Sequence, residues 1–231
     1  MALLRLTASL ALALALASCD GTISVTFSTG PQEFEVSTAA LPLPTELRDG
    51  SQIASLPCGP SGMCPPSAEV TLECAAGVCD PAPRTVSAPV GSVIDVDALL
   101  AETRDVGLST VDSYVFESVT YDIQLNTLTV PIDEIEVYWG PEAATSIDPA
   151  LGVRRFGTVP AIAAGATGGG QVVIDGAGAM ELSDYLVSRG SRIRFFAQTR
   201  VDLNPGDPFP EGSVRVAVNA TIRAVGTLLR R

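Results

Sequence analysis

Five cysteines are the residues of this 231-residue chain whose type and spacing most directly specify chemistry. Cys19 stands alone, whereas Cys58, Cys64, Cys74 and Cys79 lie close together in a Pro/Gly-rich stretch. An even cysteine set is typical of disulfides in an exported protein. We expect local pairs, Cys58 with Cys64 and Cys74 with Cys79, because each encloses a glycine-bearing turn. A nested pairing, Cys58 with Cys79 and Cys64 with Cys74, is the second expectation.

The same four cysteines could instead bind Zn²⁺ as thiolates. The pairs are separated by five and four residues, at or beyond the two to four that are usual in zinc sites. Thiolates are also poorly preserved in an oxidising compartment, and no Cys-x-x-Cys redox motif occurs. The spacing therefore predicts stabilising disulfides, with no metal and no cofactor.

Histidine is absent, which excludes Ser-His-Asp triads, Cys-His dyads and His-ligated metals. Every one of the 14 basic residues is Arg, against 26 acidic residues, and the formal net charge is −12. An acidic chain without clustered positive charge is a poor ligand for phosphate backbones, so we expect no nucleic acid partner. We predict a protein that is not an enzyme.

Three acidic residues near the single tryptophan could suggest a carboxylate pair beside a sugar-stacking ring: Asp133, Glu134 and Glu136, with Trp139. A glycosidase needs two carboxylates at a defined separation across a cleft. Glu134 and Glu136 instead alternate with apolar Ile135 and Val137, which predicts the solvated face of a strand.

Arginines alternate with apolar residues on the last two long segments, at Arg192, Arg194, Arg200, Arg215 and Arg223. If these segments paired, the guanidinium groups would share a face suited to an anionic sugar or lipid head group. The simpler interpretation is that each Arg covers apolar surface and pairs with a local acid.

Two loops and one tripeptide resemble known sites only in part. The oxygens of Asp202 to Asp207 suggest a calcium loop, but Pro205 and the missing acidic twelfth position favour a β-turn. Gly165 to Gly170 reads as a flexible loop without the Lys-Ser/Thr ending of a phosphate loop. Asn219-Ala220-Thr221 fits the glycosylation pattern but falls within an expected strand.

The N-terminus reads as a secretory signal, with Arg5 followed by a Leu/Ala run too short to span a bilayer. Leu16-Ala17-Ser18-Cys19 then resembles the bacterial lipobox. The resemblance implies removal of residues 1–18, diacylglyceryl attachment to Cys19 and acylation of the new terminus. An ordinary cleaved signal is the alternative. Several acyl chains give stable anchoring. The expected partner is therefore a membrane, to which the protein is attached through the lipid on Cys19.

Processing would change the net charge from −12 to −13, since Arg5 is the one charged residue removed. The acidic folded part of the protein would be repelled by anionic lipid head groups. Attachment to the membrane would therefore depend on the lipid at Cys19. Asp20 resembles the inner-membrane retention signal of enteric bacteria, but the Lys-free, Arg- and Ala-rich composition indicates another lineage. We expect the protein to be located in the bacterial cell envelope, at the outer rather than the inner membrane. The sequence does not specify which leaflet carries it.

Alternation of apolar and polar residues predicts a mainly β chain, an immunoglobulin-like β-sandwich with one short helix and a disulfide-stapled irregular N-terminal segment. The expected units are a short hairpin over 19–38, a stapled segment over 39–83 and the sandwich over 84–231. A helix is expected over 177–188, with Met180, Tyr185 and Leu186 inward, and a shorter one over 97–102. Expected strands within the sandwich are 86–90, 115–123, 128–132, 135–139, 156–159, 171–175, 192–203 and 213–224.

The second half of the chain resembles the water-stress (late-embryogenesis-abundant type 2) domain. The resemblance is carried by the segment 119–126, by the run from Gly157 to Gly165, and by the strand and helix after it. The resemblance covers about residues 110–227 and implies a small immunoglobulin-like sandwich without catalytic residues. In this chain Asn126-Thr127 stands where that domain has Asn-Pro. In composition the whole chain resembles lipoproteins of the myxobacterial type.

These observations favour a lipid-anchored envelope protein with a structural or binding role. The second hypothesis is a carrier of a lipid or small ligand, with the sandwich interior or the Arg-bearing strands as its site. The third is a carboxylate-dependent hydrolase.

Overall fold

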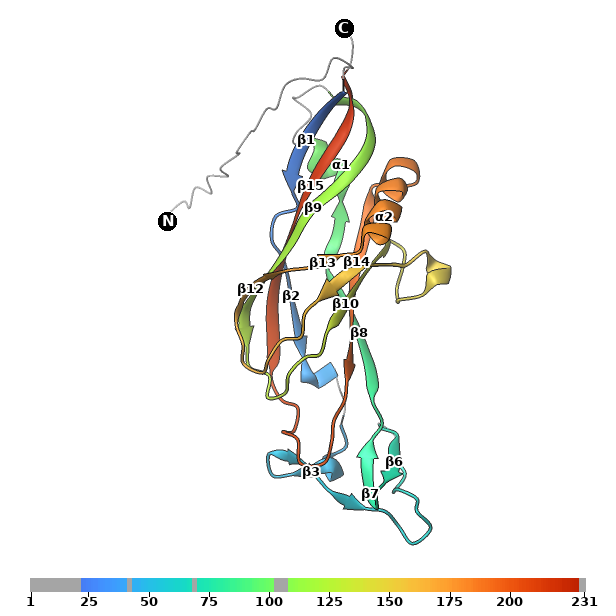
Figure 1. Ribbon diagram of the computed structural model, residues 1–231, viewed down its shortest axis with the longest axis vertical. Coiled ribbons are helices and arrows are strands. Elements are labelled where there is room, and N and C mark those ends of the chain that lie inside the picture. Colours follow the sequence, from blue (N-terminus) through green and yellow to red (C-terminus); the bar gives the residue numbers. More distant parts are fainter. Residues whose placement is uncertain (1–21, 41–42, 68–69, 102–107, 229–231) are drawn as a thin grey trace, which may run out of the picture.

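The computed structural model describes residues 22–40, 43–67, 70–101 and 108–228. The chain is mainly β and folds as two stacked five-stranded antiparallel sheets, the sandwich that the alternation predicts (Figure 1). The first sheet contains β1 (Thr22–Ser28), β2 (Gln32–Ser37), β9 (Leu108–Asn126), β12 (Gly168–Gln171) and β15 (Ser213–Leu228). The second contains β8 (Arg84–Asp95), β10 (Ile135–Pro141), β11 (Arg154–Val159), β13 (Val173–Ile174) and β14 (Arg192–Val201).

The first two strands do not form the hairpin expected over 19–38. Each pairs with β15, β1 along its second half and β2 along its first half. The Gly30-Pro31 turn between them offsets β2 along the same partner strand rather than folding it back onto β1. Both strands therefore belong to the sandwich, which does not begin at residue 84.

The longest strand, β9, contains irregularities that change which residues face inward. The strand pairs with β15, and the register shifts between the Ile222–Phe116 and Thr221–Ser118 partners. A β-bulge inserts one residue and reverses the alternation of side chains beyond it. Tyr114 and Phe116 are buried before the bulge and Val119 and Ile123 after it, whereas Val115, expected inward, is exposed.

Within the described part of the chain, two α-helices pack on the sandwich. Helix α2 (Gly176–Ser188) begins at Asp175, whose carboxylate accepts the backbone N–H groups of Ala177 and Gly178. Its buried face contains Leu182 and Leu186, while Met180, expected inward, is 66% exposed. The shorter α1 (Val96–Ala101) begins after Asp95, which accepts the N–H of Ala98, so the helix starts one residue before the expected range of 97–102.

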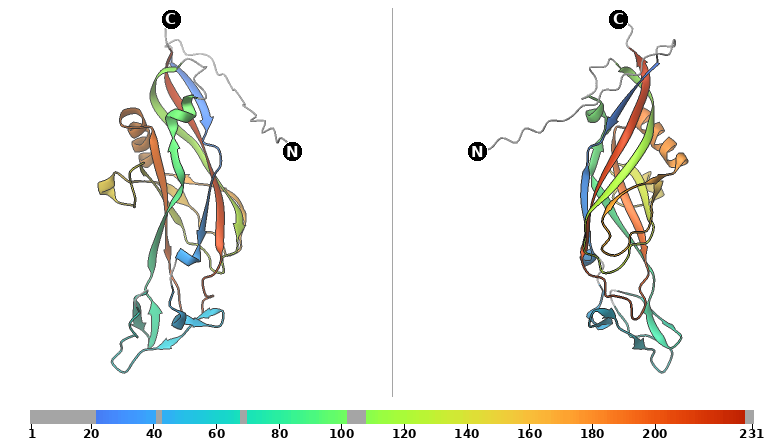
Figure 2. Two further views of the ribbon diagram at one scale, coloured as in Figure 1. Left: turned by 180° about the vertical axis from the view of Figure 1, so that it is seen from behind. Right: turned by 60° about the vertical axis from the view of Figure 1, so that its left-hand side comes forward.

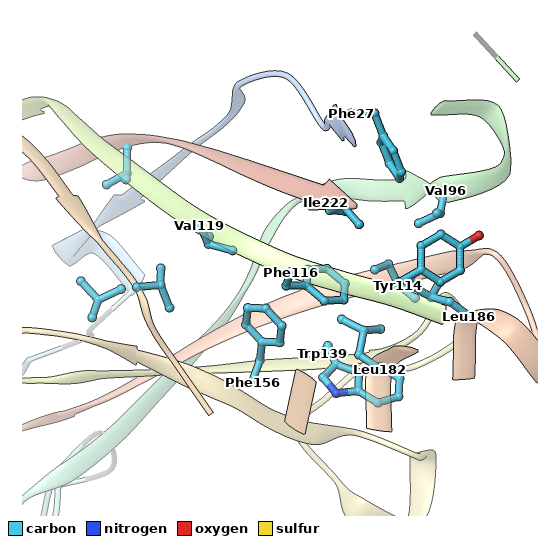
Figure 3. Packing of buried hydrophobic residues seen from close by; sticks show 14 of the residues in the cluster. Phe27, Val96, Tyr114, Phe116, Val119, Trp139, Phe156, Leu182, Leu186 and Ile222 are labelled. Atoms are coloured by element: carbon cyan, nitrogen blue, oxygen red, sulfur yellow. The ribbon is translucent and has the colours of Figure 1, made fainter. Parts of the chain in front are cut away.

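The main core fills the half of the sandwich beneath α2 (Figure 3). Phe116 and Phe156, one from each sheet, meet edge to face with ring centroids 5.4 Å apart. Trp139 packs against Tyr185 of α2 at 5.3 Å, and Leu182 is fully buried beside it. The strand expected over 128–132 is a loop, held to the loop after β11 by the Ile132–Ile162 bridge.

The expected stapled segment projects from the end of the sandwich opposite the start of β1 (Figure 1). It contains the hairpin of β3 (Arg48–Asp49) and β4 (Gln52–Ile53), and a sheet of β5 (Leu56–Pro57), β6 (Leu72–Ala75) and β7 (Val78–Pro81). Short 3-10 turns occur at Thr38–Ala40, Thr45–Leu47 and, in the sandwich, Pro149–Leu151. Leu47 and Ile53 are buried, and Ile53 exchanges backbone hydrogen bonds with Gly206 and Asp207.

The disulfides form, but with neither favoured pairing. Cys58 bonds to Cys74 and Cys64 bonds to Cys79, so the two bridges cross. Cys74 and Cys79 lie opposite each other on β6 and β7, yet each bonds to a cysteine upstream of the hairpin. The segment 58–64, which turns at Gly59, lies against the β6–β7 hairpin. Cys58 of this segment bonds to β6 through Cys74, and Cys64 bonds to β7 through Cys79. All four sulfurs are therefore bonded in pairs, and the zinc alternative is wrong for this state.

Candidate functional site: an apolar cavity between the sheets

An internal cavity of about 150 Å³ lies between the two sheets. Inward-facing side chains of both sheets line it, together with residues of the loops at the edge opposite β2 and β8. The lining consists of Thr29, Gln32, Phe34, Val36, Val86, Ala88, Val90, Ile94, Phe116, Val119, Tyr121, Ile132, Ile135, Val137, Phe156, Val159, Ile162, Val172, Ile193, Phe195, Ala197, Gln198, Thr199, Val214, Val216, Val218, Ala220 and Ile222.

The cavity exists because small residues occupy inward positions near one edge of the sandwich. Ala88 on β8 is the direct pairing partner of Ala197 on β14, and both line the cavity. Ala220 lines it from β15 in the facing sheet. These positions present only methyl groups, whereas Trp139 and helix α2 fill the other half of the sandwich. The two sheets therefore enclose space that their side chains do not fill.

The lining is almost entirely apolar and contains no charged residue. Tyr121 and two threonine and two glutamine residues supply its polar atoms. Thr29 is internally satisfied, since its hydroxyl accepts the N–H of Ala220 and donates to the carbonyl of Gly30. An engineered cavity of this volume with an apolar lining stays dry and binds benzene. The cavity can thus take an apolar group of about six carbon atoms.

The edge formed by β12 and β13 is closed by the chain itself. Gly168–Gln171 pairs with β9 in the first sheet, and Val173–Ile174 pairs with β11 in the second. Val172, between them, is buried and lines the cavity. Part of the stretch expected as a flexible glycine loop is therefore a strand that crosses between sheets.

Asn126 holds the loop beneath the cavity. Its side-chain N–H groups donate to the carbonyls of Ala163 and Ala166, and its oxygen accepts the N–H of Leu128. Asn126 is buried, so these three hydrogen bonds satisfy the amide where water cannot reach it. Its role in this structure is to fix the loop geometry.

The acidic residues near Trp139 do not form a carboxylate site with the ring. Trp139 faces the core and is 3% exposed, whereas Glu136 lies on the outer face of β10. Glu136 accepts the hydroxyl of Tyr138 and pairs with Arg155. Burial and the Glu136 hydrogen bond raise the pKa of Tyr138. Glu136 therefore lies on the outer face of β10, as expected, whereas Glu134 precedes the strand.

The arginines expected on a shared face lie on two different sheets. Strand β14 pairs with β10 and β8, and β15 pairs with β1, β2 and β9, so they are not neighbours. Arg192 pairs with Asp95 and Glu142, Arg200 with Asp202, Arg215 with Glu35, and Arg223 with Glu117. Hydrogen bonds from Ser213 and Arg215 lower the pKa of Glu35. The local-pairing interpretation is confirmed for these four arginines.

The remaining candidates are structural. Asp207 accepts the backbone N–H of Asn204 and donates its own to the Asn204 carbonyl, so this loop is the turn that the sequence favoured over a calcium loop. Asn219 lies within β15, as expected, and accepts the hydroxyl of Ser28. Cys19 and the signal lie outside the described residues. Among the residues that the structure describes, no helix has the length and apolarity to cross a membrane.

Sequence reasoning named the sandwich interior as a possible site but missed the residues that form it. The available signal was alanine at inward positions of two strands, Ala88 and Ala197. That signal has meaning only once the two strands are known to pair.

Comparisons with known proteins do not assign a family. No protein-family model matches the chain, and no curated protein matches it. Among solved structures, the chain is similar to Desmodium yellow mottle tymovirus, with 10% identity, 96% of this chain and 98% of that chain covered, and a TM-score of 0.31. It is similar to Mud crab tombus-like virus with 10% identity, coverage of 100% and 92%, and a TM-score of 0.27.

Proposed function

We propose that this chain is an exported, lipid-anchored envelope protein that binds an apolar ligand between its sheets and has no enzymatic role. The cavity carries the proposal. Protein interiors are close-packed, with few voids larger than a water molecule, so about 150 Å³ of apolar space is unexpected in a purely structural sandwich. A site of this kind offers apolar burial without groups for acid–base chemistry.

The disulfides and the N-terminal motif support export and anchoring. Two bridges in one segment fit an oxidising compartment. The first strand begins at Thr22, three residues after Cys19, a span of at most about 10 Å. A lipid on Cys19 would therefore hold the β1 end of the sandwich close to the membrane, with the disulfide-bearing segment directed away from it (Figure 1). We place the protein at the outer membrane.

Intact mass spectrometry of the protein exported by a lipoprotein-processing host tests the anchor. We expect a chain that begins at Cys19 with its acyl groups, and four thiols that react with an alkylating reagent only after reduction. An unmodified cysteine would refute the anchor, and thiols that react without reduction would refute the disulfides.

Binding of a neutral fluorescent dye, N-phenyl-1-naphthylamine, tests the cavity, which has room for its phenyl ring of six carbon atoms. The full chain is used with Cys19→Ser, which avoids detergent. Ala197→Leu places a larger side chain in the cavity, and Ala217→Leu is the matched control on the neighbouring sheet, where Ala217 lies outside the lining. We expect dye binding to fall at least tenfold in Ala197→Leu and to persist in Ala217→Leu. Equal binding by both variants would refute the cavity as the site and leave a structural role.

A further inference from the structure

The cavity reaches solvent on one side. The lining side chains of the two edge strands β2 and β8, such as Phe34, Val36, Val86 and Ala88, point between the sheets yet are only half-buried. On the opposite side Val159 and Val172 are buried. An inward-facing residue that is still exposed must be reached through an opening beside it. The seam between β2 and β8 is therefore where the cavity opens.

Side chains, not backbone, join the strands across this seam. Strand β2 pairs with β15 and β8 pairs with β14, and the two edges lie side by side without a ladder between them (Figure 2). They approach most closely near Gln32, where a Cβ on Gly91 would lie 3.4 Å from the Gln32 Cβ. Ser92 Oγ donates to Gln32 Oε1 at 3.1 Å, and this pair is exposed. An exposed hydrogen bond of this kind contributes little, so the seam can open at small cost.

The polar groups at the seam are neutral. Gln32 is part of the lining, and its Nε2 makes one long contact, 3.4 Å, with the carbonyl of Thr29. The charged residues of β2, Glu33 and Glu35, lie on its outward side, and Arg215 is paired with Glu35. On β2, a ligand carboxylate or phosphate at the seam would meet Glu33 and Glu35, and the base beside them, Arg215, is already paired with Glu35. Desolvating an unpaired charge is costly, which disfavours an anionic ligand.

We propose that the cavity binds a single-chain, uncharged amphiphile, such as a fatty alcohol or acyl ester, which enters through the β2–β8 seam and leaves its polar end at Gln32 and Ser92. This inference rests on the proposed ligand-binding function and specifies the ligand. About six carbons of the chain fill the space between the sheets. The amide of Gln32 then donates to the ligand oxygen in place of its long contact with Thr29.

Competition with the bound dye tests the ligand class in the full chain carrying Cys19→Ser. The probes are 1-octanol and octanoate at pH 8, which have equal chain length and differ in charge. We expect 1-octanol to bind at least tenfold more tightly than octanoate. Equal affinity, or tighter binding of octanoate, would overturn the assignment of an uncharged ligand.

The variant Gln32→Leu tests the polar end of the site, because it keeps the side-chain volume and removes the amide. We expect 1-octanol to bind about 2- to 12-fold more weakly, the range for one hydrogen bond. Glu33→Gln, the neighbouring outward position, is the matched control and should leave the 1-octanol affinity unchanged. An unaltered 1-octanol affinity in Gln32→Leu would refute the role of Gln32.

The two proposals fail in distinguishable ways. Dye binding that survives Ala197→Leu refutes the cavity itself. Dye binding that Ala197→Leu abolishes, together with no preference for 1-octanol, leaves the cavity as the site and refutes the ligand class.

Discussion

Replacing Gly178 by alanine reverses the usual effect of that substitution in a helix. Gly178 lies in the first turn of α2, where alanine would ordinarily stabilise by up to about 1 kcal/mol. In this protein a Cβ at Gly178 would lie 1.9 Å from the carbonyl oxygen of Arg155 on β11. That atom belongs to the backbone of a paired strand, so it cannot move aside without displacing the sheet.

The expected cost follows from these opposing terms. Overpacking in a core costs about 1–3 kcal/mol, occasionally more, and a backbone collision belongs at the upper end. After the helix gain, Gly178→Ala should lower the free energy of unfolding by about 2 kcal/mol. For a domain of this size that corresponds to a decrease in Tm of about 4–8 °C.

Thermal unfolding followed by the fluorescence of Trp139 measures this change. The single tryptophan is buried and packs against Tyr185 of α2, so its emission reports on the docking of this helix. Gly176→Ala is the matched control, because nothing lies within 4 Å of a Cβ there. We expect its Tm to stay the same or rise. A Gly178→Ala protein as stable as Gly176→Ala would refute the close approach of α2 to β11.

Three further perturbations have defined outcomes. Replacing both Cys64 and Cys79 by serine removes a bridge with a sequence separation of 15 and should destabilise by about 3 kcal/mol in the chain-entropy model, measured by urea unfolding; an unchanged midpoint would count against the bridge. Asp175→Ala removes the N-cap of α2 and should cost about 1 kcal/mol in the same assay, whereas Asp175→Asn should retain most of the stability. The raised pKa of Tyr138 means that its contribution to stability is present below the ordinary tyrosine pKa of about 10 and is lost as the pH rises above it. Wild type should therefore lose stability relative to Tyr138→Phe on passing from about pH 9 to about pH 11, and parallel pH profiles would contradict the Glu136 contact.

Local sequence pattern was sufficient for features that depend on neighbouring residues. Alternation over 86–90 and 135–139 correctly predicted β8 and β10, and the outward placement of Glu136. The segment before Gly190 correctly predicted α2. These predictions succeed because the period of side-chain direction in a strand or helix is a property of the backbone itself.

Prediction failed where one residue changes the outcome over a distance. The bulge in β9 placed Val115 outside and Phe116 inside, although Val115 fits the simple alternation. Tyr185 and Leu186 of α2 pack against the core as expected, but Met180 does not, because the face that docks on the sheet contains Gly178, Leu182 and Leu186. Neither the bulge nor the docking contact leaves a local signature.

The amino-acid sequence by itself determined the class of the protein: a mainly β chain with paired cysteines, no histidine chemistry, and an N-terminus that predicts export and a lipid on Cys19. Only the tertiary structure decided which cysteines pair, that β1 and β2 share one partner strand, and that Ala88 lies beside Ala197 on the wall of an open interior. The reason is that these features are set by which segments meet, and segments far apart in the chain meet according to sheet register and packing. The crossed disulfides and the unfilled cavity are consequences of that assembly.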